Sequence, residues 1–214
     1  MIKGVIFDMD GVIVDSERFI CEAGIKMFAE HNVFVKPEDF VPFVGAGENR
    51  YLGGVAEKYG FPIDIEKDKA RTYEIYAEIV KGKLKPLPGV IDFIKRCRSR
   101  KLKLALATSA DKVKMLVNLK EIGIPPETFD AIVNGLDVKK KKPDPEIFLS
   151  AAKKMNLLCS ECLVVEDAVN GVKAAKAAGA KCLALTTSFS PEDLKCADWI
   201  ASKLADAPEE SISW

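Results

Sequence analysis

The order of hydrophobic and polar residues at the start of the chain predicts a short buried strand that ends in charged residues. The segment from Ile2 to Phe7 is rich in β-branched and bulky residues and is too short for a helix before Gly11. Side chains alternate between the faces of a strand, so Asp8 and Asp10 are expected on the same side, beside a sharp turn at Gly11. This strand would deliver both carboxylates to one place.

The pattern changes to helical spacing after residue 15. Apolar residues recur at the intervals of an amphipathic helix between Phe19 and Phe28, and Ser16 is positioned to be the N-cap. Further helices are expected over 48–59 and 64–80, and the helical pattern of the sequence ends at Gly82. Residues 16–82 are therefore predicted to form a separate helical domain.

Helical and strand patterns alternate from Gly89 onward. The expected helices cover 90–100, 111–122, 145–155 and 169–178, and the expected strands cover 103–108, 131–134, 162–165 and 181–185. Such alternation indicates a parallel sheet with right-handed crossovers and helices on both faces. The predicted fold class is α/β, a doubly wound parallel sheet built from residues 1–15 and 83–214, with the helical domain inserted into it.

The amino-acid composition limits the kinds of molecule that the protein is expected to bind. The chain has 214 residues, of which 48% are hydrophobic, and its 32 basic residues balance its 32 acidic residues. Without a net positive field, neither nucleic acid nor an anionic membrane is an expected partner. No apolar stretch approaches the length of a membrane span, and no signal peptide precedes the first strand. We therefore expect a cytoplasmic, soluble protein, and we expect it to be a monomer.

Polar residues that could carry chemistry follow several of the predicted strands. They are Asp8, Asp10, Thr108, Ser109, Lys142, Glu166 and Asp167. Ligands of parallel sheets bind at the carboxyl ends of the strands, so these side chains are expected to converge. Neighbouring carboxylates repel each other unless a cation lies between them, and Mg²⁺ is the usual one. Taken alone, Asp8 and Asp10 fit an Asx-rich turn equally well, but the whole set contains what is needed to hold a phosphoryl group and a magnesium ion.

Four short motifs resemble those of the haloacid dehalogenase (HAD) superfamily, in its branch of small-molecule phosphatases and β-phosphoglucomutases. They are Phe7-Asp8-Met9-Asp10-Gly11, Ala107-Thr108-Ser109, Lys142-Pro143-Asp144-Pro145 and Val165-Glu166-Asp167. The resemblance covers essentially the whole chain. It implies a Rossmann-like core, and it implies that the helical insertion is the cap domain that closes over the substrate.

The resemblance also assigns roles to the residues of the motifs. It makes Asp8 the nucleophile that accepts the phosphoryl group and Asp10 the acid and base, with Thr108 and Lys142 holding the phosphoryl oxygens. Gly11 and Ser109 would contribute to substrate binding. The Mg²⁺ ligands would be Asp8, Asp10 through its backbone carbonyl, Asp167, and Glu166 directly or through water.

Substrate choice is expected to come from the helical insertion, where the sequence departs from the mutase pattern. Ile20 stands where the mutases carry a histidine that assists the acid/base aspartate. In the loop over 43–50, their substrate-binding arginine falls nearest Glu48, with Arg50 two residues further on. Arg50 and Arg71 are candidate substrate-binding residues, although an arginine at position 71 fits a solvated helix face as well.

These observations predict a Mg²⁺-dependent phosphatase of a small phosphomonoester, most plainly a sugar phosphate, acting through an aspartyl-phosphate. The alternative is β-phosphoglucomutase activity, which the loss of the histidine at Ile20 disfavours. A non-catalytic interaction protein on the same scaffold is disfavoured because every charged motif residue is present. A dehalogenase is disfavoured because carbon–halogen displacement does not require Asp10 or the second acidic pair.

Overall fold

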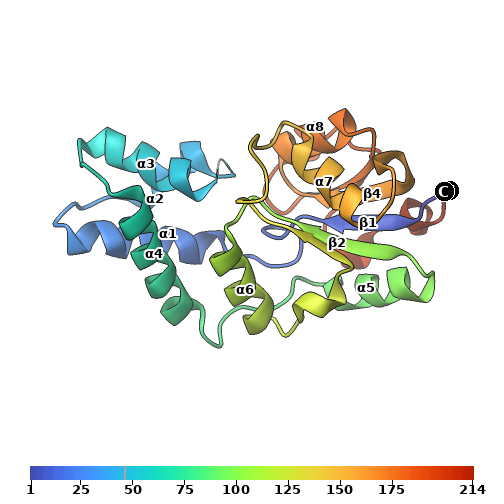
Figure 1. Ribbon diagram of the computed structural model, residues 1–214, viewed down its shortest axis with the longest axis horizontal. Coiled ribbons are helices and arrows are strands. Elements are labelled where there is room, and N and C mark those ends of the chain that lie inside the picture. Colours follow the sequence, from blue (N-terminus) through green and yellow to red (C-terminus); the bar gives the residue numbers. More distant parts are fainter. Residues whose placement is uncertain (46) are drawn as a thin grey trace.

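The computed structural model describes residues 1–45 and 47–214, so Ala46 of the loop over 43–50 lies outside the described residues. The chain forms a sheet flanked by helices, with a group of helices beside it (Figure 1). This arrangement agrees with the predicted α/β class.

A six-stranded sheet with every neighbouring pair parallel forms the centre of the larger part. Its strands are β1 (Gly4–Phe7), β2 (Lys103–Ala107), β3 (Ala131–Val133), β4 (Cys162–Glu166), β5 (Lys181–Leu185) and β6 (Trp199–Ala201), in the order β3-β2-β1-β4-β5-β6. Phe7 of β1 lies opposite Leu106 on one side and Val165 on the other. The first strand of the chain is therefore internal, and its carboxyl end opens between those of β2 and β4.

Alternation along each strand divides the sheet's side chains between two apolar layers. Phe7 belongs to the layer that includes Phe93 of α5 (Val90–Ser99). Ile6 belongs to the opposite layer, which includes Phe148 of α7 (Glu146–Lys154) and Val172 of α8 (Val169–Ala177). Figure 1 shows α7 and α8 on one side of the sheet and α5 on the other. The sheet is doubly wound, as the alternating sequence pattern predicts.

The predicted helical insertion contains α1 (Glu17–Glu30), α2 (Pro37–Phe40), α3 (Glu48–Tyr59) and α4 (Ile65–Val80), which we call the cap helices. They pack on one another and lie beside the sheet (Figure 1). Helix α6 (Lys112–Glu121), which follows β2, packs against α4, and the Lys69 ammonium lies 2.6 Å from Asp111 Oδ2. The domain boundaries at residues 15/16 and 82/83 stay a prediction.

Two further features complete the architecture. Short 3₁₀ helices cover Val41–Phe43, Pro126–Thr128, Cys159–Glu161, Leu204–Asp206 and Glu209–Ile212. Among the helices of residues 1–45 and 47–214, none combines the length and the apolar character needed to cross a membrane.

Candidate active site

Asp8 lies directly beyond β1 and is tied to Lys142. Its backbone N–H donates to the carbonyl of Val165 at 2.9 Å, which continues the hydrogen bonding of the sheet and fixes the start of its side chain. The Lys142 ammonium, from the loop between β3 and α7, lies 2.5 Å from Asp8 Oδ1 and 2.5 Å from Glu166 Oε1. The structure thus brings together Asp8, Lys142 and Glu166, three of the residues that the sequence predicts to converge.

Glu166, the last residue of β4, is almost completely buried and has partners for both carboxylate oxygens. Oε1 faces Lys142, and Oε2 accepts hydrogen bonds from the backbone N–H groups of Asp167 at 2.8 Å and Ala168 at 2.9 Å. A Cβ atom on Gly171 would lie 1.9 Å from the Glu166 carboxyl carbon, so α8 passes this carboxylate only because residue 171 has no side chain. In this arrangement Glu166 positions Lys142.

Asp167 points toward the turn that follows β1. Its Oδ2 atom accepts a hydrogen bond from the hydroxyl of Ser188, beyond β5. A Cβ on Gly11 would lie 1.9 Å from the same oxygen, and Gly11 has a φ of +74°. Glycine is therefore required at position 11 both by the backbone conformation and by the close approach of Asp167.

Asp10 is held by two residues from outside its own strand. The hydroxyl of Ser16 donates to Oδ1, and the ammonium of Lys114 lies 3.1 Å from Oδ2. Ser16 stands at the N-cap position of α1, as predicted, but its side chain makes no capping hydrogen bond. The Ser16 hydroxyl orients Asp10 instead of capping the helix.

Thr108 and Ser109 follow β2 and line the same cavity as Asp8 and Asp10, which has a volume of about 530 Å³. Thr108 is buried, and its Oγ1 atom accepts a hydrogen bond from the backbone N–H of Ala110 at 3.1 Å. Because a hydroxyl can accept and donate at once, this leaves the Thr108 proton available to a ligand oxygen. The cavity joins the ends of β1, β2, β4 and β5 in one site.

Negative charge exceeds positive charge at the centre of this cavity. Among the described residues that line the cavity, Asp8, Glu166 and Asp167 contribute carboxylates, and the ammonium of Lys142 contacts those of Asp8 and Glu166. Burial raises the pKa of Asp8 to about 7 although Lys142 opposes the shift, and burial together with the neighbouring carboxylates also raises the pKa of Asp167. The centre is therefore short of a cation.

The donor set fits a magnesium ion. In the described part of the chain no three Cys, His, Asp or Glu side chains come close enough to form a complete metal site. Mg²⁺ does not need one, because it is usually bound by one or two carboxylates and keeps water or phosphate oxygens as its other ligands. Asp8 and Asp167 are the carboxylates suited to this role.

Comparison with known proteins places this arrangement in a family. A family model described as haloacid dehalogenase-like hydrolase matches residues 2–179. The chain belongs to the haloacid dehalogenase-like hydrolases. The resemblance seen in its four motifs is thus confirmed, and the chain is a hydrolase of this family.

Among related proteins of this family, the chain is similar to Protein SUPPRESSOR OF QUENCHING 1, chloroplastic, of Arabidopsis thaliana, with 43% identity over 91% of this chain and 19% of that protein. It thus corresponds to a small part of that relative. It is 36% identical to a Phosphorylated carbohydrates phosphatase of Thermotoga maritima, over 83% of this chain and 82% of the relative. The crystal structure of β-phosphoglucomutase from Clostridium difficile matches with a TM-score of 0.86 and 25% identity, covering 100% and 96% of the two chains.

The two arginines predicted to bind substrate do not line the cavity of this hydrolase. Arg50 pairs with Glu57 at 2.8 Å, and its guanidinium lies over the ring of Phe43. Arg71 pairs with Glu30 and Glu74, each at 2.8 Å, and is exposed on α4. The solvated helix face, which the sequence left open for Arg71, is the arrangement observed, because acidic neighbours on the cap helices hold both guanidinium groups there.

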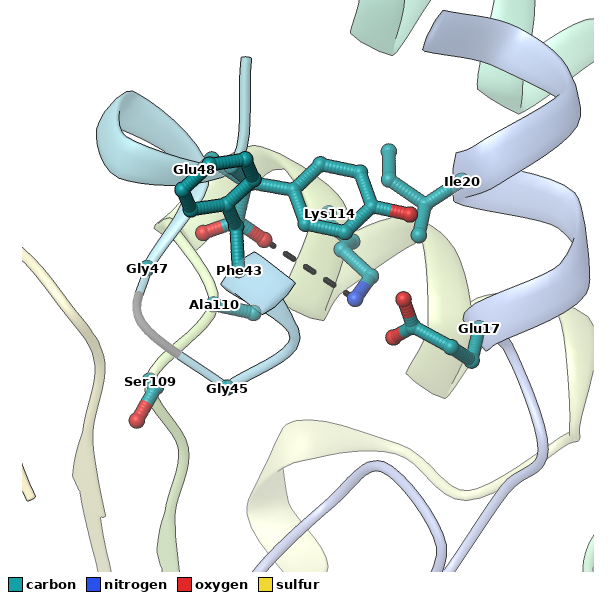
Figure 2. A pocket seen from close by; sticks show the side chains of 10 residues that line it. Glu17, Ile20, Phe43, Gly45, Gly47, Glu48, Ser109, Ala110 and Lys114 are labelled. Atoms are coloured by element: carbon teal, nitrogen blue, oxygen red, sulfur yellow. Dashed lines mark ion pairs between the residues drawn. The ribbon is translucent and has the colours of Figure 1, made fainter. Parts of the chain in front are cut away.

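Ile20 and Glu48, from the cap helices, lie near Lys114, which contacts Asp10. Both line a small cavity with Lys114, as Figure 2 shows, and Lys114 in turn contacts Asp10. Ile20 is buried, with 3% of its surface exposed. Position 20, where the resemblance to the mutases predicts a histidine, is therefore apolar here and adjoins Lys114, the partner of Asp10.

Lys114 and Ser188 are functional candidates that the sequence reasoning missed. Lys114 carried a signal, because it shares the inward face of α6 with Met115 and Asn118, where a lysine is out of place without a buried acid. Ser188 carried none, since a serine in a polar loop after β5 is ordinary in sequence. Its contact with Asp167 exists only because β4 and β5 are neighbours.

Proposed function

We propose that this protein is a Mg²⁺-dependent phosphatase of a small phosphomonoester, with a sugar phosphate as the favoured class, and that Asp8 forms an aspartyl-phosphate. The observation that carries the proposal is the convergence of Asp8, Asp10, Lys142 and Asp167 on one cavity at the strand ends. The similarity to a phosphatase of phosphorylated carbohydrates supports the substrate class.

The first half of the reaction transfers the phosphoryl group to Asp8. A carboxylate oxygen of Asp8 forms the new bond to phosphorus, while the bond from phosphorus to the ester oxygen of the substrate breaks. Asp10 donates a proton to that ester oxygen, which leaves as an alcohol. Lys142 and the Thr108 hydroxyl face the phosphoryl oxygens and stabilise their charge.

The second half returns the enzyme to its starting state. Asp10, now ionised, takes a proton from water, whose oxygen bonds to phosphorus as the bond from phosphorus to Asp8 breaks. Inorganic phosphate leaves, and Asp10 is again protonated. A bound Mg²⁺ would supply the positive charge that offsets the repulsion between Asp8 and the phosphate oxygens. Ser16 and Lys114 keep the Asp10 carboxyl group directed at the cavity throughout.

The second candidate is β-phosphoglucomutase activity, which the similarity to a solved mutase structure favours. Ile20 argues against it, because an apolar side chain beside the partner of Asp10 offers no donor or acceptor to gate the phosphorylated enzyme. Hydrolysis is then the expected outcome. A non-catalytic role is disfavoured by the same convergence of charged residues.

Two further expectations remain predictions. A monomeric state is expected, and so is a location in the cytoplasm, although one relative is named as chloroplastic. The particular phosphomonoester is left to the screen described next.

The test is a phosphate-release screen over a panel of phosphorylated metabolites, with Mg²⁺ and with EDTA. Asp8→Asn is expected to fold and to lose roughly 10³-fold or more in turnover, because no covalent nucleophile remains. Asp167→Asn is expected to lose both activity and Mg²⁺ binding, measured by calorimetry. Asp92→Asn, at an exposed position of α5, is the matched control. Near-normal release by Asp8→Asn, or full activity in EDTA, would refute the proposal.

A further inference from the structure

A second, smaller cavity adjoins the catalytic cavity under the cap helices. It has a volume of about 50 Å³ and lies between α1, the start of α3 and α6 (Figure 2). Glu17, Gly45 and Ser109 line both cavities, so the two cavities adjoin at these residues. Whatever is attached to the phosphate can extend from the first cavity into the second.

This cavity contains carboxylate oxygens that lack hydrogen-bond donors. The Glu48 side chain is 10% exposed, and its Oε1 atom lies 3.8 Å from the Lys114 ammonium. Its Oε2 atom has no hydrogen-bond partner within the described residues, and the same holds for Glu17 Oε1 and for the hydroxyl of Tyr51, which lines the same cavity. Buried polar atoms in proteins are nearly always paired. The Tyr51 hydroxyl is a donor close to Glu17, so Glu48 Oε2 is the oxygen that calls for a donor that the described chain does not supply.

The electrostatics of Glu48 agree with this geometry. Burial raises the pKa of Glu48 to about 7, although the positive charge of Lys114 opposes the shift. A donor from a ligand would stabilise the ionised carboxylate. Figure 2 shows the Lys114 ammonium between Glu48 and Glu17, where it presents N–H donors of its own.

A hydroxyl group is the ligand group that satisfies all of these neighbours. It donates its proton to a carboxylate and accepts from an ammonium at the same time. An amine on the ligand would satisfy Glu17 and Glu48 but would be repelled by Lys114. A second phosphate would be repelled by both carboxylates. The cavity volume of about 50 Å³ also leaves room for only about three or four water-sized groups.

We propose that the cavity formed by Glu17, Glu48 and Lys114 binds the hydroxyl groups of an uncharged polyol or sugar moiety of the substrate. The inference rests on the proposed phosphatase function and deepens it. Glu48 and Glu17 accept from the hydroxyls, and Lys114 donates to them. The enzyme therefore prefers polyol monophosphates to bisphosphates.

The test compares the kcat/KM values of wild type and Glu48→Gln for three probes. For sorbitol 6-phosphate we expect a loss of about 10-fold or more, the effect of losing a hydrogen bond to a charged acceptor. For p-nitrophenyl phosphate, which has no hydroxyl groups, we expect no change. For fructose 1,6-bisphosphate we expect a smaller loss than for sorbitol 6-phosphate, because a repelling charge is removed together with the hydrogen-bond acceptor. Glu57→Gln, at an exposed position of the same helix, should change none of the three values.

Each other outcome overturns the proposal. An equal loss on p-nitrophenyl phosphate would show that Glu48 acts on Asp10 through Lys114 and not on the leaving group. An unchanged value for sorbitol 6-phosphate, or faster turnover of 2-aminoethyl phosphate than of sorbitol 6-phosphate, would show that hydroxyl groups are not recognised here. Glu17→Gln provides a second variant, for which we expect the same selective loss.

Binding measurements test the proposed hydroxyl subsite independently of turnover. In an Asp8→Asn background, calorimetry with sorbitol 6-phosphate should show weaker binding when Glu48→Gln is added, whereas the binding of inorganic phosphate should not change. If wild type releases no phosphate from any probe, the proposed function fails, and the calorimetric comparison still supports or overturns the subsite. Equal affinities with and without Glu48→Gln would overturn it.

Discussion

The ammonium of Lys114 lies 3.1 Å from Oδ2 of Asp10, although 104 residues separate them in the chain. Lys114 comes from α6 and is 4% exposed, so the proposed acid–base residue is held by a buried cation from another element. The other carboxylate oxygen is held by Ser16 at the start of α1. Asp10 thus has partners on both sides, one from α6 and one at the first of the cap helices, and its orientation depends on both.

Lys114→Met is expected to lower kcat by about 10- to 100-fold, because general acid–base catalysis depends on the orientation that Lys114 imposes on Asp10. The free energy of unfolding should fall by about 1–3 kcal/mol, since Asp10 and Glu48 lose a buried partner. Steady-state kinetics and denaturant melts measure the two effects. Lys112→Met, at an exposed position of the same helix, is the control.

A purely structural role for Lys114 would give a different result. In that case kcat of the folded variant would match wild type, and its dependence on pH would be unchanged. A positioning role requires a changed pH profile of kcat and partial rescue by Lys114→Arg, which restores a donor near Asp10.

Gly171 provides a test of how Glu166 holds Lys142. Alanine normally stabilises a helix relative to glycine by about 0.5–1 kcal/mol, but a Cβ at position 171 would lie 1.9 Å from the Glu166 carboxyl carbon. Gly171→Ala is therefore expected to lower the free energy of unfolding by about 1–3 kcal/mol and to reduce activity, because Glu166 must move away from Lys142. The measurements are a thermal melt and kcat.

The control for this clash is another helical glycine. Gly53 of α3 has no atom within 4 Å of the position that a Cβ would occupy, so Gly53→Ala should stabilise the protein and leave kcat unchanged. If Gly171→Ala behaved like Gly53→Ala, the close packing of α8 against Glu166 would have no functional consequence.

The secondary structure could be predicted from the sequence wherever the periodic pattern of apolar residues was long enough to identify a helix or a strand. The five strands β1 to β5 and the helices of the alternating region were predicted to within a few residues, because buried parallel strands and amphipathic helices have distinct periods. β6 was missed because its three residues, at the edge of the sheet, carry too short a pattern. Its place is decided by pairing with β5, which is a tertiary contact.

The residues of the candidate site likewise include some that the sequence could predict and some that it could not. Asp8, Thr108 and Glu166 converge because each lies at the carboxyl end of a parallel strand, and that rule can be applied to a sequence. The pairing of Arg50 with Glu57 and of Arg71 with Glu30 could not be predicted from the sequence, since it depends on how the helices pack and on which acidic side chains lie nearby. The spacing of residues within one helix does not show which acidic side chain an arginine will contact.

Asp39 links α2 to α3 and should make the cap helices sensitive to acid. Hydrogen bonds from the Lys58 ammonium, the Tyr59 hydroxyl and the backbone N–H of Lys36 hold the pKa of Asp39 below its usual range. A lowered folded-state pKa contributes stability above the unfolded pKa of about 4, and this contribution is lost as the pH falls through the folded-state pKa. Asp39→Asn should therefore lower the Tm at neutral pH, by an amount that shrinks in acid.

Thermal melts from neutral pH to about pH 3 measure this effect, because that range spans the unfolded pKa of an aspartate. Glu38→Gln, at the exposed neighbouring position, removes a carboxylate that makes none of these hydrogen bonds and serves as the control. A difference in Tm between wild type and Asp39→Asn that stays constant over the whole range would mean that the ionised Asp39 carboxylate does not stabilise the cap helices.

Ile20 decides between the phosphatase and the mutase. A mutase must keep water from its phosphorylated aspartate while the bisphosphate intermediate turns over, which calls for a polar gate beside the acid–base residue. Ile20 has no donor or acceptor and is buried beside Lys114. With β-glucose 1-phosphate, a bisphosphate primer and magnesium, wild type should therefore release free phosphate and form little glucose 6-phosphate.

Ile20→His places an imidazole in the small cavity, near both Lys114 and Glu48, and should shift the ratio of glucose 6-phosphate to free phosphate toward the mutase product. The shift should be modest, because the carboxylate of Glu48 remains and disfavours the second phosphate of a bisphosphate intermediate. Lys26→His, at an exposed position of α1, should leave the ratio unchanged. Fast conversion by wild type with little free phosphate would replace the phosphatase with the mutase, since an apolar residue at position 20 would then be compatible with a protected aspartyl-phosphate.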